Sequence, residues 1–323
     1  MSAPPLAVGV RAIKVPRWLA PGSTSGAIIA LIVLVLLNVF FTPNFATTSN
    51  FWNVLLQASE VVLVAVGMTL VIATGGIDLS VGSVMAIAGS VAAVQLGLGM
   101  APAIALALLA GLLVGFLNGA LITRDRIQPI VVTLATLIAG RGLAQVISND
   151  GQLVSITNPS FEVLGRSHIG AVPTPVILAL VVVVAAAFAL HSLPFGRYVL
   201  AAGGNPAAAR LAGVPVRRTL VTVYALSGLL AGIAGLIEVS RLGASDAAKV
   251  GVNIELDAIA AVVVGGTALS GGRATILGTV VGALIMQVIA TSFNMLLVPY
   301  AWSLALKAAI IVFAVYLQRA RRV

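Results

Sequence analysis

The chain has 323 residues, of which 60% are hydrophobic and only 8% are charged, and its net charge is +9. This is more apolar surface than a single soluble core can bury, so lipid must form part of its solvent. Unpaired backbone groups are not tolerated in hydrocarbon, so apolar runs of about 20 residues should cross as helices rather than as open sheet. The composition therefore predicts an all-α, polytopic integral membrane protein.

The charged residues exclude several functional classes. The 18 Lys and Arg residues lie mostly between apolar runs, a pattern typical of membrane topology and not of nucleic-acid binding. Cysteine is absent, and His168 and His191 are too few and too far apart for a metal cluster. No Gly-x-x-x-x-Gly-Lys-Ser/Thr sequence is present. We therefore expect no enzymatic activity, metal or cofactor in this chain, and any ATP and Mg²⁺ to be bound by a partner.

Ten apolar stretches predict ten membrane spans. They lie at about 23–41, 58–74, 80–99, 101–121, 129–147, 173–190, 219–240, 256–270, 274–292 and 296–317. A turn-like break at 97–102 separates the third from the fourth, and the short, glycine-interrupted eighth is expected to be broken or re-entrant. The first run could instead be a secretory signal, but it exceeds a usual h-region and further spans follow it.

The basic residues predict the orientation of these spans. With a cytoplasmic N-terminus, thirteen of them lie inside: Arg11, Lys14, Arg17, Arg124, Arg126, Arg197, Arg210, Arg217, Arg218, Arg273, Arg319, Arg321 and Arg322. Only Arg166, Arg241 and Lys249 lie in outside loops. This asymmetry satisfies the positive-inside rule and predicts two cytoplasmic termini.

The connecting segments indicate a single domain. Segments 42–57, 148–172 and 241–255 are expected outside, and 191–218 is the largest inside loop. None is long enough to form a folded extramembrane domain. We therefore predict one transmembrane domain, 1–323, with a cytoplasmic N-terminal segment, 1–24, and expect any ligand-capturing or catalytic module to be another chain.

One polar turn interrupts the apolar runs at 74–83. Gly75 and Gly76 end one run, and Ser80 is placed to cap the next helix. Asp78 could likewise be a helix cap, or it could have a direct functional role, because an acidic residue between membrane helices is costly without a partner. A similar run at 265–273 is expected on the same side of the membrane, which argues against an inverted repeat, so we interpret it as convergent turn chemistry.

The inside loop contains a predicted two-turn helix. Asn205 suits the N-cap, Pro206 the first turn and Gly213 the C-cap, with Ala208 and Arg210 between them. This helix could hold its arginine near anionic lipid. It could equally dock into a soluble partner.

Several of these segments together resemble one family. They are 74–83, Leu117-Asn-Gly119 with Gln128-Pro129 and Arg141-Gly142, the loop 203–213, and the run 255–272. In this order they are similar to the ribose/xylose/arabinose/galactoside permeases of ABC importers, over about residue 51 to the C-terminus. The stretches 66–74, 139–145 and 151–154 favour the ribose and galactofuranose permeases.

This resemblance implies a type II-like importer permease in the bacterial inner (plasma) membrane. It further implies a second permease protomer in a homo- or heterodimer, a periplasmic or extracellular sugar-binding protein, and a cytoplasmic ABC ATPase. It gives the 205–213 helix the role of coupling the ATPase to the membrane, by analogy with the family.

Polar residues within the spans are candidates for a substrate pathway. Ionisable groups at this depth usually face protein or water, which draws attention to Arg141, Glu238, Asp257 and Lys307. Alternatively, the first two form an ion pair and Lys307 snorkels to the surface, which is the interpretation we prefer for this lysine. The amides of Asn118, Gln145 and Gln287 could bind sugar hydroxyls or join helices.

A different class of function remains open. An ion-coupled secondary sugar transporter would also account for the many helices and for Asp78 and Asp257 at membrane depth. Such a transporter would need no ATPase and no coupling helix. The sugar itself does not follow from the sequence.

Overall fold

The computed structural model describes residues 24–319, except for the side chains of 300 and 313–319. The predicted N-terminal segment, 1–24, thus lies outside the described residues apart from Thr24. The helices are α1 Thr24–Phe41, α2 Thr48–Ala73, α3 Val81–Gln95, α4 Met100–Arg124, α5 Pro129–Ile147, α6 Pro159–Arg166, α7 Thr174–Ser192, α8 Pro194–Gly204, α9 Pro206–Leu211, α10 Val216–Leu242, α11 Ile254–Val264, α12 Ile276–Met295 and α13 Tyr300–Arg319.

Extended structure in this range is confined to two minimal antiparallel ladders. β1 Val154–Ser155 pairs with β4 Ala244–Ser245, and β2 His168–Ile169 pairs with β3 Val172–Pro173. The predicted all-α class is therefore confirmed.

Within the described residues, eight helices are long and apolar enough to cross a membrane: α1, α2, α3 with its 3-10 extension to Leu98, α4, α5, α7, α10 and α12. The predicted eighth span is shorter than its apolar run, because α11 ends at Val264. Its 11 residues extend only about 16 Å, roughly half the hydrocarbon thickness. In α13 the described apolar part is 301–312. Ten crossings therefore remain a prediction.

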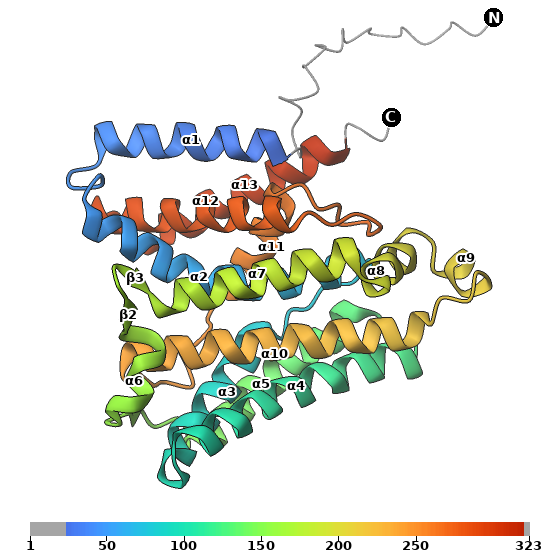
Figure 1. The fold of residues 1–323 in the computed structure, drawn as a ribbon, viewed down its shortest axis with the longest axis horizontal. Helices are drawn as coiled ribbons and strands as arrows, with labels where there is room; N and C mark the ends of the chain where they lie inside the picture. The colour runs from blue at the N-terminus through green and yellow to red at the C-terminus, as the bar shows by residue number, and fades with distance from the viewer. Residues whose placement is uncertain (1–23, 320–323) are drawn as a thin grey trace, which may run out of the picture.

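The two ends of the molecule carry different elements. In Figure 1, α8 and α9 lie at one end, together with the first turn of α1 and the last turn of α13. The opposite end carries α6, β2 and β3. This arrangement agrees with an even number of crossings and with 191–218 and 148–172 on opposite sides.

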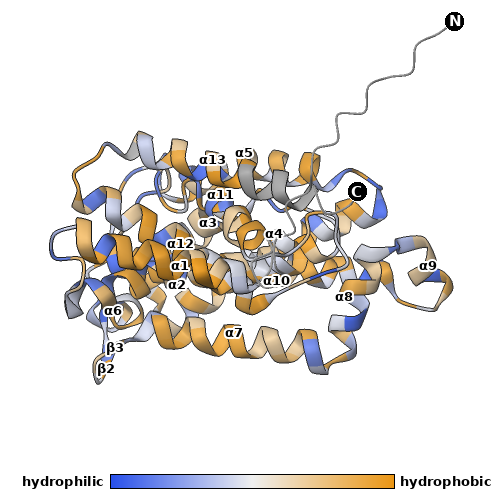
Figure 2. Ribbon diagram, turned by 90° about the horizontal axis from the view of Figure 1, so that it is seen from above, coloured by the Kyte–Doolittle hydropathy of each residue, from blue (hydrophilic) through white to orange (hydrophobic). Residues whose placement is uncertain are grey.

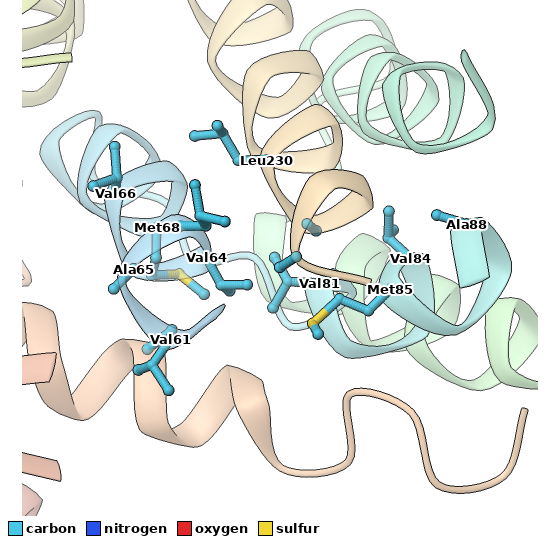
Figure 3. Packing of buried hydrophobic residues seen from close by; sticks show 14 of the residues in the cluster. Val61, Val64, Ala65, Val66, Met68, Val81, Val84, Met85, Ala88 and Leu230 are labelled. Carbon is cyan, nitrogen blue, oxygen red and sulfur yellow. The ribbon is translucent and has the colours of Figure 1, made fainter. Parts of the chain in front are cut away.

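The core lies around α2, α3 and α10. Figure 3 shows Val64 and Met68 of α2, Met85 of α3 and Leu230 of α10 in one apolar cluster. Glycines allow the central helices to approach closely: a Cβ on Gly111 of α4 would lie 2.6 Å from the carbonyl oxygen of Gly228 in α10. By contrast, α1 is only 11% buried.

Apolar side chains also cover much of the outer surface. Phe40 is 79% exposed and Ile138 is 69% exposed, on α1 and α5 respectively. In Figure 2 the hydrophilic residues gather towards the ends, around α6 and around α8 and α9. Lipid is the solvent that such helix faces require.

Candidate functional site

A buried polar network begins in the turn between α2 and α3. Asp78 is 1% exposed, and its Oδ1 accepts hydrogen bonds from the backbone N–H of Ser80 at 3.0 Å and from the Ser80 hydroxyl at 2.6 Å. Its Oδ2 accepts from the hydroxyl of Ser227 at 2.8 Å. Ser227 lies near the middle of α10, so this carboxylate ties the turn to the central helix within the membrane-spanning region.

The same network continues to α4 and α5. Asn118 donates from Nδ2 to the Ser80 hydroxyl at 2.9 Å, and its Oδ1 accepts from the Thr136 hydroxyl at 2.6 Å. These two residues also supply the polar lining of a hollow of about 440 Å³ between α4 and α5, whose other lining residues are apolar. Asn118 therefore joins helices, the structural one of its two predicted roles.

The local geometry corrects the predicted cap. Ser80 occupies the N-cap position of α3, but its hydroxyl makes no capping hydrogen bond. It instead donates to Asp78 and accepts from Asn118. The carboxylate wins this hydroxyl because a charge-assisted hydrogen bond is stronger than a neutral one. Asp78 thus both accepts the backbone N–H of Ser80, as a cap would, and reaches across to α10.

Gly75 and Gly76 have separate reasons to be glycine. The first has a φ of +83°, in the left-handed region that ends α2. The second lies against the Tyr224 hydroxyl, where an added Cβ would overlap it. That hydroxyl is buried and lacks a hydrogen-bond partner within the described residues.

A second polar cluster holds the segment between α10 and α11. Arg141 donates from Nη1 to the carbonyl oxygens of Ala247 at 3.0 Å and Val250 at 2.6 Å. Glu238 accepts from the backbone N–H of Gly251 at 3.1 Å. The alternative in which Arg141 and Glu238 pair with each other is therefore wrong, because each binds the backbone of this segment.

This segment, part of the predicted outside loop 241–255, packs against the neighbouring helices; the side of the membrane on which it lies stays a prediction. Arg241 still belongs to α10, and Gly251 approaches α3 so closely that a Cβ on it would lie 2.6 Å from the carbonyl oxygen of Gly82. Glu255 follows, and its Oε2 is buried without a hydrogen-bond partner in the described part of the chain. Gln145 is half-buried one turn beyond Arg141 on α5.

The other candidates in the spans have protein partners. Lys307 is only 6% exposed, and its Nζ lies 2.8 Å from Asp257, so the snorkelling prediction is wrong. Because Lys307 has a counter-ion within the protein, its side chain does not extend to the membrane surface. Gln287 donates to Gln57 of α2 at 3.2 Å and to Thr291 at 3.3 Å. The contact with Gln57 joins α12 to α2, whereas Thr291 lies one turn further along α12 itself.

Sequence reasoning missed Glu60, which pairs with Arg241 at 3.0 Å. Glu60 is 7% exposed within α2. The sequence did offer a signal for Glu60, because an acidic residue within an apolar run needs a partner in the protein. The same rule identified Asp257. Ser227 and Thr136 were missed because a hydroxyl in a helix usually bonds its own backbone and gives no distinct pattern.

The predicted two-turn helix is present as α9. Asn205 Oδ1 accepts from the backbone N–H groups of Ala207 at 3.1 Å and Ala208 at 3.0 Å. Pro206 begins the helix, and Gly213 beyond it has a φ of +81°. The short helix α8, directly before it, was not predicted.

The surface of α9 is almost entirely free within this chain. Ala209 is buried, whereas Ala208 and Arg210 are exposed. The Arg210 guanidinium donates from Nε to the carbonyl oxygen of Pro206 at 3.1 Å, one turn back. Leu211 is 91% exposed and was not singled out from the sequence. In Figure 1, α9 projects from the end of the helical bundle.

Among the described residues no group of three or more His, Cys, Asp or Glu side chains could hold a metal ion. The charged clusters are occupied instead by hydrogen bonds and ion pairs within the protein.

Comparisons with known proteins agree with this architecture. Residues 50–315 match the model of the family described as the permease component of the branched-chain amino acid transport system. The chain is 42% identical to the ribose import permease protein of Escherichia coli K12, over 90% of this chain and 91% of that protein. It is 40% identical to the ribose import permease of Bacillus subtilis 168, over 91% and 92% of the two chains.

A further relative is the galactofuranose transporter permease protein of Escherichia coli K12, which is 39% identical over 91% of this chain and 89% of its own. No solved structure matches the chain significantly.

Proposed function

The chain belongs to this permease-component family, as the membrane-spanning subunit of an ATP-driven importer, and we propose that its cargo is a monosaccharide similar to ribose or galactofuranose. The family description names branched-chain amino acids, whereas the relatives at about 40% identity are named as sugar permeases. Because the sugar permeases are similar over about nine-tenths of both chains, we propose a sugar and not a branched-chain amino acid as the cargo.

The importer needs partners beyond this chain. The sequence contains no P-loop, so ATP and Mg²⁺ bind to a separate cytoplasmic ATPase, and this chain is not catalytic. A periplasmic or extracellular binding protein delivers the sugar, and a second permease protomer completes the pathway. The assembly lies in the lipid of the bacterial inner membrane, with both termini of this chain cytoplasmic on the strength of its basic residues.

The ATPase docks on α9. Three observations support this role: α9 projects from the bundle, its caps give it a fixed shape, and its outer face consists of small residues beside one long apolar side chain. Leu211, at 91% exposure, is the apolar anchor that a groove in the partner would bury. Arg210 adds a charge-assisted hydrogen bond to an acidic or carbonyl group.

The sugar crosses along the face formed by α4 and α5. Thr136 of α5 and Asn118 of α4 line the hollow on this face, and Arg141 and Gln145 are further half-buried polar residues of α5 beyond it. Asp257 and Gln287 do not lie on this route, because their polar atoms bind Lys307 of α13 and Gln57 of α2.

Substitutions on α9 test the docking role. Ala208→Trp should abolish co-purification of the ATPase from detergent extracts, because the indole would occupy the space that the groove needs. Ala171→Trp, at an exposed position in the β2–β3 turn, is the matched control and should retain the ATPase. Arg210→Lys should keep the ATPase bound but weaken sugar-stimulated hydrolysis. Normal co-purification and stimulation in both α9 variants would overturn this assignment.

A further inference from the structure

Three separate segments of backbone meet without intervening side chains at the base of α9. They are the last residue of α2, Ala73, the end of α8 at Gly203, and the α11–α12 loop at Gly271 and Gly272. We propose that these four residues, the glycine joint, form a rigid contact that carries movement of α9 to the Asp78 network. This inference rests on the proposed coupling function of α9.

Contact at the joint is closer than any side chain allows. A Cβ on Gly203 would overlap the carbonyl oxygen of Ala73 and would lie 2.7 Å from the backbone nitrogen of Gly272. That nitrogen donates a hydrogen bond to the same carbonyl oxygen at 2.9 Å. Backbone packed directly on backbone leaves no rotamer to absorb a displacement, so one segment cannot shift without moving the others.

The joint also accounts for the two similar glycine-rich runs of the sequence. A Cβ on Gly271 would lie 2.9 Å from the backbone nitrogen of Gly75 and 2.8 Å from the carbonyl oxygen of Gly203. The run after α2 and the run after α11 therefore touch each other as well as α8. Each supplies a glycine turn because each must approach the same point.

Both sides of the joint are stiff. Towards α9, the only residue between α8 and α9 is Asn205, and Val199 and Ala202 anchor α8 at 0% and 1% exposure. Within the α11–α12 loop, the backbone N–H of Thr275 donates to the Thr267 hydroxyl at 3.1 Å, and the Thr275 hydroxyl donates to the carbonyl oxygen of Gly265. A displacement of α9 is therefore transmitted to the joint, because no flexible loop separates the two.

From the joint, the chain leads directly to the buried polar network. Ala73 is five residues before Asp78, whose carboxylate binds Ser227 on α10. Ser80 extends the contact through Asn118 to α5. A displacement entering at the joint therefore arrives at α10 and at α4 and α5, the two helices that form the proposed pathway.

Neighbouring glycines provide a matched pair of variants. Gly203→Ala must separate the segments, whereas a Cβ on Gly204 would meet only the Gly272 Cα at 4.0 Å, an ordinary contact. In proteoliposomes containing the permease, its ATPase and its binding protein, with D-ribose as the probe, Gly203→Ala should lower ATP-driven uptake by about tenfold or more. Gly204→Ala should resemble the unmodified protein.

The amount of bound ATPase separates the possible outcomes. Gly203→Ala should still co-purify with the ATPase, since α9 itself is unchanged. Equal uptake by the two alanine variants would overturn the joint while leaving the docking role intact. An ATPase that does not bind even the unmodified permease would instead overturn the proposed function.

Discussion

Replacing Asp78 by alanine should destabilise the protein much more than replacing it by asparagine. The carboxylate accepts three hydrogen bonds, from the Ser80 backbone, the Ser80 hydroxyl and the Ser227 hydroxyl. Asparagine can keep two of them through its Oδ1, and its amide can donate to Ser227, whose hydroxyl accepts as readily as it donates. Alanine can make none of them.

The magnitude follows from what each group does when the carboxylate is lost. The Ser227 hydroxyl can rotate to a backbone carbonyl of α10, as serines in helices commonly do, and the Ser80 hydroxyl still accepts from Asn118, so their cost is small. The Ser80 N–H cannot turn away, and an unpaired buried donor costs about 1–3 kcal/mol. The vacated volume adds roughly 1 kcal/mol. Asp78→Ala should therefore cost about 2–4 kcal/mol, and Asp78→Asn less than about 1.5 kcal/mol.

Thermal unfolding of the purified permease in detergent measures this difference, with uptake in proteoliposomes as the second readout. Ser227→Ala, which removes only one donor, is the graded control and should cost roughly 0.6 kcal/mol, the average for hydrogen bonds between membrane helices. Equal unfolding temperatures for the alanine and asparagine variants would refute the hydrogen-bond argument. A stable asparagine variant without transport would instead assign the charge itself a functional role.

Three further predictions concern the charged residues and the topology. Lys307→Met should cost about 1–3 kcal/mol because it leaves the half-buried Asp257 carboxylate unpaired, and adding Asp257→Asn should restore much of the unfolding temperature; no restoration would contradict the ion pair. Arg141→Gln should release the segment between α10 and α11, so that a cysteine at the buried Ala247 reacts faster with an impermeant maleimide than in the parent; an unchanged rate would argue against this anchor. Reporters at Val323 and in the β2–β3 turn should lie on opposite sides of the membrane; the same side for both would refute the topology.

Much of the fold follows from local sequence. The apolar runs predict the long helices, because each must satisfy its own backbone in lipid. The short helix α9 is equally predictable, since Asn205 and Pro206 begin it and Gly213 follows its end by rules that act over a few residues. The early end of α11 is also consistent with the glycines that follow it.

The partners of the buried polar groups could not be predicted in this way. Glu60 and Arg241 are 181 residues apart, and Asp257 and Lys307 are 50 apart, so no local spacing relates them. The inward packing of the segment between α10 and α11 could not be predicted for the same reason, because the Arg141 side chain that binds its carbonyl oxygens comes from another helix.

The energy source of transport tests the central claim most directly. Proteoliposomes containing the permease with its ATPase, supplied with loaded binding protein and radiolabelled D-ribose, can be compared with and without ATP while ionophores collapse the Na⁺ and H⁺ gradients. An importer subunit predicts uptake that requires ATP and the ATPase and that survives the ionophores. Uptake by the permease alone, driven by an ion gradient and abolished by the ionophores, would contradict this account and favour a secondary transporter.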